Sequence, residues 1–313
     1  MTHWIATDAS SASDSFSADA DCETVFSVQT AHSAFGTHTL APWREVLRAF
    51  GARLVPRRYP RVGSILNWPI WRLSLVGRSG PVDLQPYPGF ALRLYPRENH
   101  ADSKCYARPG LCDLPEEAAI ARCAAGSPDD RFIMVDVGAN TGTYSVLSAN
   151  LARQAGKEPH ITCIEANPRT QKRLATNLHF SGLEACAKIV PFAVSDTSGR
   201  VILDVAQWNL GSVKVTEAAG SLTGRKLISV PARTLLDVVR AAELARIDFL
   251  KIDIEGHEVP ALGPFLETVP KDLLPRMVLA ETKHDKGNAL STLLLKAGYS
   301  ATHHGRSDTV FER

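Results

Sequence analysis

The stretch "MVDVGANTG", residues 134 to 142, runs from an apolar strand into a turn with two glycines. Glycines at such a turn let a ligand approach the backbone, and the free amides at the start of the following helix favour an anionic group. Asp136 adds a carboxylate where the chain leaves the strand. The stretch therefore predicts a nucleotide site in an α/β fold, and the question is which nucleotide fits beside a negative charge.

The glycine spacing argues against a dinucleotide. Gly138 and Gly142 form G-x-x-x-G, and Asn140 stands where the dinucleotide fingerprint has its middle glycine. A pyrophosphate in a partly desolvated cleft would be repelled by Asp136. S-adenosylmethionine fits better, since it carries an ammonium and a sulfonium, has no phosphate, and can turn its carboxylate to the helix start. The other interpretation of Asp136 is a turn aspartate that caps the helix.

A second acid follows the next expected strand. Glu165 is the second-last residue of "HITCIEA" and follows Asp136 by 29 residues, a position where a carboxylate can accept hydrogen bonds from both ribose hydroxyls. Acids at this position serve NAD as well, and a solvated acid at a strand end is the other interpretation. The two acids in this order favour a nucleoside ligand.

Strands and helices alternate from residue 131 onward, which predicts an α/β fold with a mostly parallel sheet, helices on both faces and ligands at the carboxyl ends of the strands. The expected strands are RFIMVDV (131–137), HITCIEA (160–166), AKIVPFAV (187–194), IDFLKIDI (247–254) and RMVLAET (276–282), with β pieces at 200–206, 211–217 and 226–232 and a closing hairpin of YSATHH and DTVFE. The expected helices span 143–156, 167–182, 234–244 and 289–298.

The first third of the chain has a different composition. Residues 1–24 are rich in Ser, Ala and Asp, which predicts a disordered tail. Residues 25–115 are rich in Pro and Arg and form an accessory segment, with a helix at "APWREVLRAF" and a small hairpin from "VDLQP" and "FALRLYP". A helix at "LPEEAAIARCAAG" leads into the cofactor-binding domain, expected at 116–313.

Composition narrows the class of protein. The chain has 313 residues, 44% hydrophobic and 22% charged, with a formal charge of +2, so we expect a globular protein that does not bind nucleic acid. Six scattered cysteines without a C-x-x-C pair, and a start without a signal sequence, predict a cytoplasmic protein. The apolar stretch 62–77 is interrupted by Asn67, Pro69 and Arg72, so we expect no membrane span.

The stretch "FLKIDIEGHE", residues 249–258, is the candidate reacting centre. It places five ionisable groups within eight residues at the end of an apolar strand, and buried charges are costly unless they are paired or used. Strand alternation predicts Lys251, Asp253 and Glu255 on one side. An ion pair from Lys251 to Asp253 or Glu255 that holds the loop is the alternative.

The next strand ends at Glu281, and His284 follows. Methyl transfer to oxygen needs a group that takes the hydroxyl proton, and carboxylates or an imidazole can do so. The eligible groups are Asp253, Glu255, His257, Glu281 and His284. Asp253 and Glu281 could instead hold a divalent cation, although their spacing specifies no particular metal.

An ordered set of motifs resembles the FkbM family of S-adenosylmethionine-dependent methyltransferases over about residues 130–312. The set is VDVGANTGTYS, IEANP, LATNL, FAVSDTSG, NLGSV, VPARTLLDVV, DFLKIDIEGHE and ETKH, and the preceding GFALRLYPRE and PEEAAI resemble the family more weakly. The resemblance implies a class I methyltransferase, Rossmann-like fold with seven strands, an antiparallel last strand and a small N-terminal β/α extension.

The resemblance also implies roles for single residues. Asp136, Gly138, Asn140 and Gly142 would hold the methionine end, Glu165 the ribose, and Ser195 with Asp196 would lie near the adenine. Asp253, Glu255 and Glu281 would face the methyl group, and His257, where relatives have a small residue, is a further catalytic candidate.

The implied activity is methylation of a hydroxyl on a sugar or secondary metabolite, with a small-molecule or glycan acceptor. The sequence leaves the acceptor, a metal and the oligomeric state open. A nicotinamide-dependent oxidoreductase and a non-catalytic binding module of the same fold are the alternatives.

Overall fold

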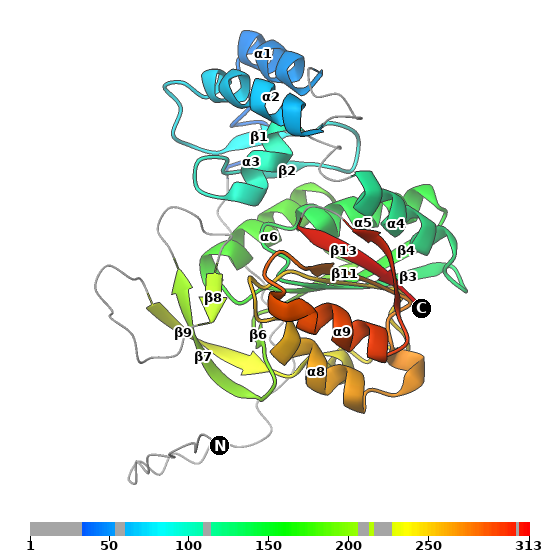
Figure 1. Ribbon diagram of the computed structural model, residues 1–313. Helices are drawn as coiled ribbons and strands as arrows, with labels where there is room; N and C mark the ends of the chain where they lie inside the picture. Colours follow the sequence, from blue (N-terminus) through cyan, green and yellow to red (C-terminus); the bar gives the residue numbers. More distant parts are fainter. Residues whose placement is uncertain (1–32, 54–59, 109–113, 206–212, 216–226, 305–306) are drawn as a thin grey trace.

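The computed structural model describes residues 33–53, 60–108, 114–205, 213–215, 227–304 and 307–313 (Figure 1). The predicted tail at 1–24 lies outside these ranges. None of the helices in the described part is long and apolar enough to cross a membrane. Of the cysteines in these ranges, Cys105, Cys123, Cys163 and Cys186 are free thiols.

A seven-stranded sheet forms the centre of the molecule, in the order β12-β13-β11-β10-β3-β4-β5. Strands β5, β4, β3, β10 and β11 are parallel neighbours, and β13 runs antiparallel to both β11 and β12. The strands span Arg131–Val137 (β3), Glu158–Ile164 (β4), Ala187–Val190 (β5), Phe249–Ile252 (β10), Met277–Glu281 (β11), Ser300–His304 (β12) and Asp308–Glu312 (β13). The mostly parallel sheet with one reversed strand and the terminal hairpin are therefore confirmed.

Helices cover both faces of this sheet (Figure 1). Strand alternation sends Met134 into the core with α4, α5 and α6, and its neighbour Val135 into the core with α7, α8 and α9. The helices span Leu114–Ala125 (α4), Thr143–Gln154 (α5), Pro168–Phe180 (α6), Leu235–Ala241 (α7), Glu258–Thr268 (α8) and Ala289–Lys296 (α9), with short 3-10 turns at Lys271–Leu273 and Lys286–Asn288. Asn167 caps α6 through its side chain, and Pro168 occupies the first helical position.

The expected third strand at 187–194 is wrong as a single strand. It divides into β5 and β6, and Pro191 stands between them. Proline has no N–H to donate, so the ladder with β4 ends there. Strand β6 joins a second, four-stranded sheet in the order β6-β9-β7-β8. Its strands span Ala193–Val194 (β6), Gly199–Val205 (β7), Val213–Val215 (β8) and Leu227–Arg233 (β9).

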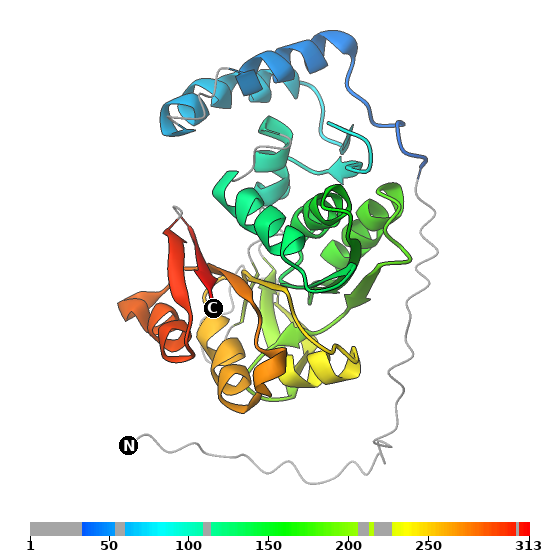
Figure 2. The same ribbon diagram turned by 90° about the vertical axis from the view of Figure 1, so that its right-hand side faces the viewer.

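The accessory segment contains the predicted first helix and hairpin, and two helices that the sequence analysis did not predict. These elements are α1 (Pro42–Arg53), α2 (Pro60–Ser74), β1 (Val82–Leu84), β2 (Leu92–Leu94) and α3 (His100–Ala107). Both views place α1 and α2 at one end of the molecule, with α3 and the hairpin between them and the sheet (Figures 1 and 2).

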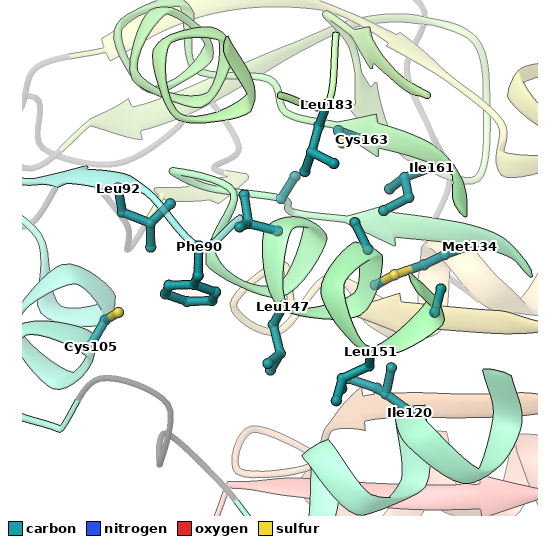
Figure 3. Packing of buried hydrophobic residues seen from close by; sticks show 14 of the residues in the cluster. Phe90, Leu92, Cys105, Ile120, Met134, Leu147, Leu151, Ile161, Cys163 and Leu183 are labelled. Atoms are coloured by element: carbon teal, nitrogen blue, oxygen red, sulfur yellow. The ribbon is translucent and has the colours of Figure 1, made fainter. Parts of the chain in front are cut away.

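The hairpin and α3 share a hydrophobic core with the sheet domain. Phe90 and Leu92 lie in the same buried cluster as Leu147 of α5 and Met134 of β3 (Figure 3). Cys105 of α3 belongs to this cluster as well. This continuous core anchors the accessory segment beside the glycine turn, whereas the boundary at residue 115 remains a prediction.

Candidate functional site

A pocket lies at the carboxyl ends of β3, β4 and β10, which is the edge where α/β sheets bind ligands. The residues that line it are Val137, Gly138, Asn140, Ile164, Glu165, Ala166, Phe192, Ala193, Val194, Leu203, Asp253, Ile254, Glu255 and His257. Six of the predicted site residues are thus brought together: Gly138, Asn140, Glu165, Asp253, Glu255 and His257. The other five, Asp136, Gly142, Ser195, Asp196 and Glu281, lie outside this lining.

The glycine turn has a conformation that other residues would not tolerate. Gly138 has φ 75°, and a Cβ built there would lie 2.1 Å from the carbonyl oxygen of Asp253. Gly142 has φ 89° and begins α5 as its N-cap. The first glycine is therefore needed for close packing against the loop after β10, in addition to any approach of a ligand.

Asp136 lies beneath the turn rather than at the pocket surface. It is fully buried, accepts a hydrogen bond of 2.6 Å from Ser145 Oγ, and lies 3.3 Å from Lys251 Nζ. Burial opposes the charge on Lys251, but the attraction of Asp136 and Asp253 outweighs it and raises the pKa of the amine. The open negative charge that we expected at the turn is thus half of an ion pair, and Lys251 Nζ also donates to Gly138 O at 3.1 Å.

Glu165 directly follows β4 and accepts hydrogen bonds from the backbone of the glycine turn and of Asn167, the N-cap of α6. Its carboxylate accepts hydrogen bonds from Asn140 N at 2.9 Å and Asn167 N at 2.8 Å. Burial raises the pKa of Glu165 to about 7, although these two hydrogen bonds oppose the rise. Its predicted contact with ribose hydroxyls remains a prediction, and its contact with Asn140 fixes the turn.

Helix α3 supports the same turn from the other side, a contact that the sequence analysis missed. Asn99 Nδ2 donates to Asn140 Oδ1 at 2.7 Å. Asp102 is fully buried and accepts hydrogen bonds from Thr141 Oγ1 and from Tyr95 N. Asn99 also caps α3 by accepting a hydrogen bond from Ala101 N. An asparagine directly before "HADSK" is the feature of the sequence that could have predicted the start of this helix.

Ser195, Asp196 and His257 form a short hydrogen-bonded chain. Ser195 Oγ lies 3.0 Å from His257 Nε2 and 3.0 Å from Asp196 Oδ1. Burial lowers the pKa of His257, which favours the neutral imidazole at neutral pH. His257 thus connects the pocket to the two residues predicted near the adenine, and the structure does not join it to Glu281.

The acids after β10 leave the strand pattern that we predicted for them. Strand β10 ends at Ile252, so alternation does not extend to Asp253 and Glu255. Lys251 points to Asp136 at 3.3 Å and approaches Asp253 only at 4.0 Å. Glu258 holds the loop, because its Oε1 accepts from Ile254 N and Gly256 N.

Glu255, Glu281 and His284 gather at one point beside the pocket. The acid-to-imidazole distances are 3.5 Å from Glu255 Oε2 to His284 Nε2 and 3.8 Å from Glu281 Oε1 to the same nitrogen. Burial, followed by repulsion from Asp253 and Glu255, raises the pKa of Glu281 to about 8. At neutral pH the raised pKa keeps the Glu281 carboxyl largely protonated, because neighbouring acids disfavour a further negative charge there.

The strand order and the site define the class of protein. A seven-stranded sheet with this order, one reversed strand and a pocket beyond β3, β4 and β10 is the class I methyltransferase fold. The sequence profile described as Methyltransferase FkbM domain matches residues 136–301, more than half of the chain. The chain belongs to the FkbM methyltransferase family.

Individual relatives are distant. The hexuronic acid methyltransferase AglP of Haloferax volcanii is 25% identical over 152 residues, which cover 48% of this chain and 56% of AglP. The crystal structure of methyltransferase FkbM from Methylobacillus flagellatus KT has 16% identity and a TM-score of 0.41, covering 87% of this chain and 59% of that one. A precorrin-6y C5,15-methyltransferase from Geobacter metallireducens has 12% identity and a TM-score of 0.34, covering 63% and 86%. The match thus spans little more than half the length of the first two relatives.

Proposed function

We propose that this protein transfers the methyl group of S-adenosylmethionine to a hydroxyl of a sugar or secondary metabolite. The main support for this proposal is the set of residues that line the pocket. Among the residues that the structure describes, its lining contains Glu165, Asp253 and Glu255 but no Lys or Arg. The phosphates of a ligand would be repelled by these three acids, whereas an ammonium and a sulfonium would be attracted by them.

The other half of the pocket fits a nucleoside base. Phe192, Ala193, Val194 and Leu203 present apolar surface beside Glu165. An adenine could lie against this surface while the ribose hydroxyls donate to the Glu165 carboxylate. A nicotinamide dinucleotide would fit this pocket poorly, because its central pyrophosphate would lie beside the acidic residues.

In the proposed reaction the sulfonium supplies an activated methyl group, so this chain has to align the acceptor and remove its proton. The C–S bond breaks as the O–C bond forms, and the sulfur keeps the electron pair. Asp253 is the proposed base, since it lines the pocket and its side chain is 40% exposed. The hydroxyl proton passes to the Asp253 carboxylate.

AglP is named as a hexuronic acid methyltransferase, which supports a sugar acceptor for this chain. Calorimetric titration with S-adenosylmethionine, S-adenosylhomocysteine and NAD tests the cofactor. Labelled donor with free sugars, uronic acids and their glycosides tests the acceptor. Glu165→Gln should weaken donor binding, and Glu184→Gln, a change of an exposed glutamate, serves as the matched control. Binding of NAD alone would overturn the proposal, and label in no acceptor would favour the non-catalytic binding module.

A further inference from the structure

The cluster of Glu255, Glu281 and His284 has the composition and dimensions of a cation site. One ligand atom from each residue lies within 4.8 Å of the other two. Two ligands about 2.1 Å from one metal at a tetrahedral angle lie about 3.4 Å apart. The measured 3.5 Å and 3.8 Å separations around His284 Nε2 are close to that value.

Two buried polar atoms of this cluster have no hydrogen-bond partner among the described residues. The Glu281 side chain is 8% exposed, and its Oε2 has no hydrogen-bond partner among them. His284 Nε2 is also buried without a hydrogen-bond partner in the described part of the chain. Buried polar atoms are nearly always paired, so an unpaired carboxylate oxygen and an unpaired imidazole nitrogen in one cluster indicate a missing ligand.

The charges around the cluster also indicate that a cation is missing from it. Among the side chains that the structure describes, which do not include that of Lys286, no Lys or Arg forms an ion pair with Glu255 or Glu281. The buried amine of Lys251 is paired with Asp136. A bound cation would supply the missing positive charge.

The backbone of Glu255 is strained in the conformation that places its side chain in the cluster. Its φ is 57°, in the left-handed region that a glutamate rarely adopts, and the loop continues through Gly256 at φ 100°. A glycine at position 255 would remove this strain and one carboxylate together. A Glu255→Gly variant should therefore lose a metal ligand without losing stability.

We propose that Glu255, Glu281 and His284 bind one divalent cation at the acceptor side of the pocket. Two carboxylate oxygens and one imidazole nitrogen suit Mn²⁺ or Zn²⁺. The role of the cation rests on the proposed function: it would bind the acceptor oxygen and lower the pKa of the hydroxyl that Asp253 deprotonates. The cation would also reduce repulsion of an acidic sugar.

This site differs from the pair that the sequence analysis considered. Asp253 with Glu281 was one alternative for a cation, whereas the structure brings Glu255 and His284 to Glu281. Asp253 stays at the pocket surface, 4.0 Å from Lys251.

The test is metal binding by the full-length protein, measured apart from any methyl transfer. After removal of metals with a chelator, Mn²⁺ is titrated and the free ion is followed by its electron paramagnetic resonance signal, with Zn²⁺ calorimetry as a second probe. We expect one Mn²⁺ per chain. Glu281→Gln and His284→Gln should weaken binding by about tenfold or more, whereas the control His304→Gln, in β12, should not change it.

Glu255→Gly provides the variant that cannot be explained by misfolding. We expect it to unfold at the same or a higher temperature than the unaltered protein and to bind Mn²⁺ at least about tenfold more weakly. No binding of either ion to the unaltered protein, or equal binding in the Glu281 and His284 variants, overturns the proposal. Donor binding measured on the same samples distinguishes failure of the metal site from failure of the proposed methyltransferase function.

Discussion

Lys251 Nζ lies 3.3 Å from Asp136 Oδ1, and the two residues are direct partners in the register of β10 and β3. The pair is almost completely buried, with Lys251 also donating to Gly138 O. It therefore joins the two motifs that carry the family resemblance, the glycine turn and the acidic loop, inside the protein. A charge in one motif is balanced by a charge in the other.

Removing one charge of this pair should lower the free energy of unfolding more than removing both charges. Lys251→Met leaves Asp136 buried without its cation, and we expect a loss of about 3–5 kcal/mol in the free energy of unfolding. The double variant Lys251→Met with Asp136→Asn removes both charges and should recover much of that loss. Urea denaturation of the two single variants and the double variant measures the coupling. Strictly additive losses would show that the two charges do not depend on each other.

Gly138 and Gly156 provide a matched test of the turn. Both have positive φ, 75° and 72°, but a Cβ at Gly138 would lie 2.1 Å from Asp253 O, whereas one at Gly156 would have nothing within 4 Å. Gly156→Ala should therefore cost only the backbone strain, about 1–2 kcal/mol. Gly138→Ala should cost clearly more and should weaken donor binding, because Asp253 must move. Thermal melts and donor calorimetry on both variants check this, and equal effects would contradict it.

Much of the site could be predicted because its signals are local. The strand, the glycine turn and Glu165 follow from residue types at short spacing, and their places at the carboxyl ends of β3 and β4 follow from strand and helix alternation. Pro191 was also a local signal: the break between β5 and β6 follows from its missing N–H.

The contacts that the sequence analysis missed depend on long-range geometry. Lys251 meets Asp136 because β10 inserts beside β3 in one particular register, and no spacing in the sequence specifies that register. Glu255 reaches His284 through a left-handed turn that strand alternation cannot foresee. Asn99 reaches Asn140 because the hairpin and α3 pack on the sheet domain.

Asp102 should give the protein a stability that depends on pH. Burial raises its pKa from 3.8 to about 6, although hydrogen bonds from Thr141 and Tyr95 oppose the rise. Between these two values the folded protein binds more protons than the unfolded chain, so the free energy of unfolding falls as pH rises through about 4 to 6. A separation of about two pKa units corresponds to a loss of up to about 3 kcal/mol above that window.

Asp102→Asn tests this directly, because an amide can still accept from Tyr95 N and can donate to Thr141 Oγ1. Relative to the unaltered protein, the variant should gain up to about 3 kcal/mol at pH 8 and much less at pH 4. Thr141→Val, which removes a hydrogen bond to the carboxylate, should move the window to higher pH. Urea denaturation at several pH values gives the difference, and a difference that does not vary with pH would contradict the assignment.

Asp253→Asn should separate donor binding from methyl transfer. The asparagine has nearly the same size, leaves Lys251 paired with Asp136, and leaves Glu165 and Glu255 in the pocket to attract the donor, so donor affinity should fall far less than the transfer rate. It cannot accept the hydroxyl proton as a carboxylate does, and loss of a general base lowers the rate by about 10²–10⁴-fold. Donor calorimetry and single-turnover transfer of labelled methyl measure the two effects on one sample, with Glu184→Gln as the exposed control. An unchanged transfer rate would move the base to another group, and lost donor affinity would instead place Asp253 against the cofactor.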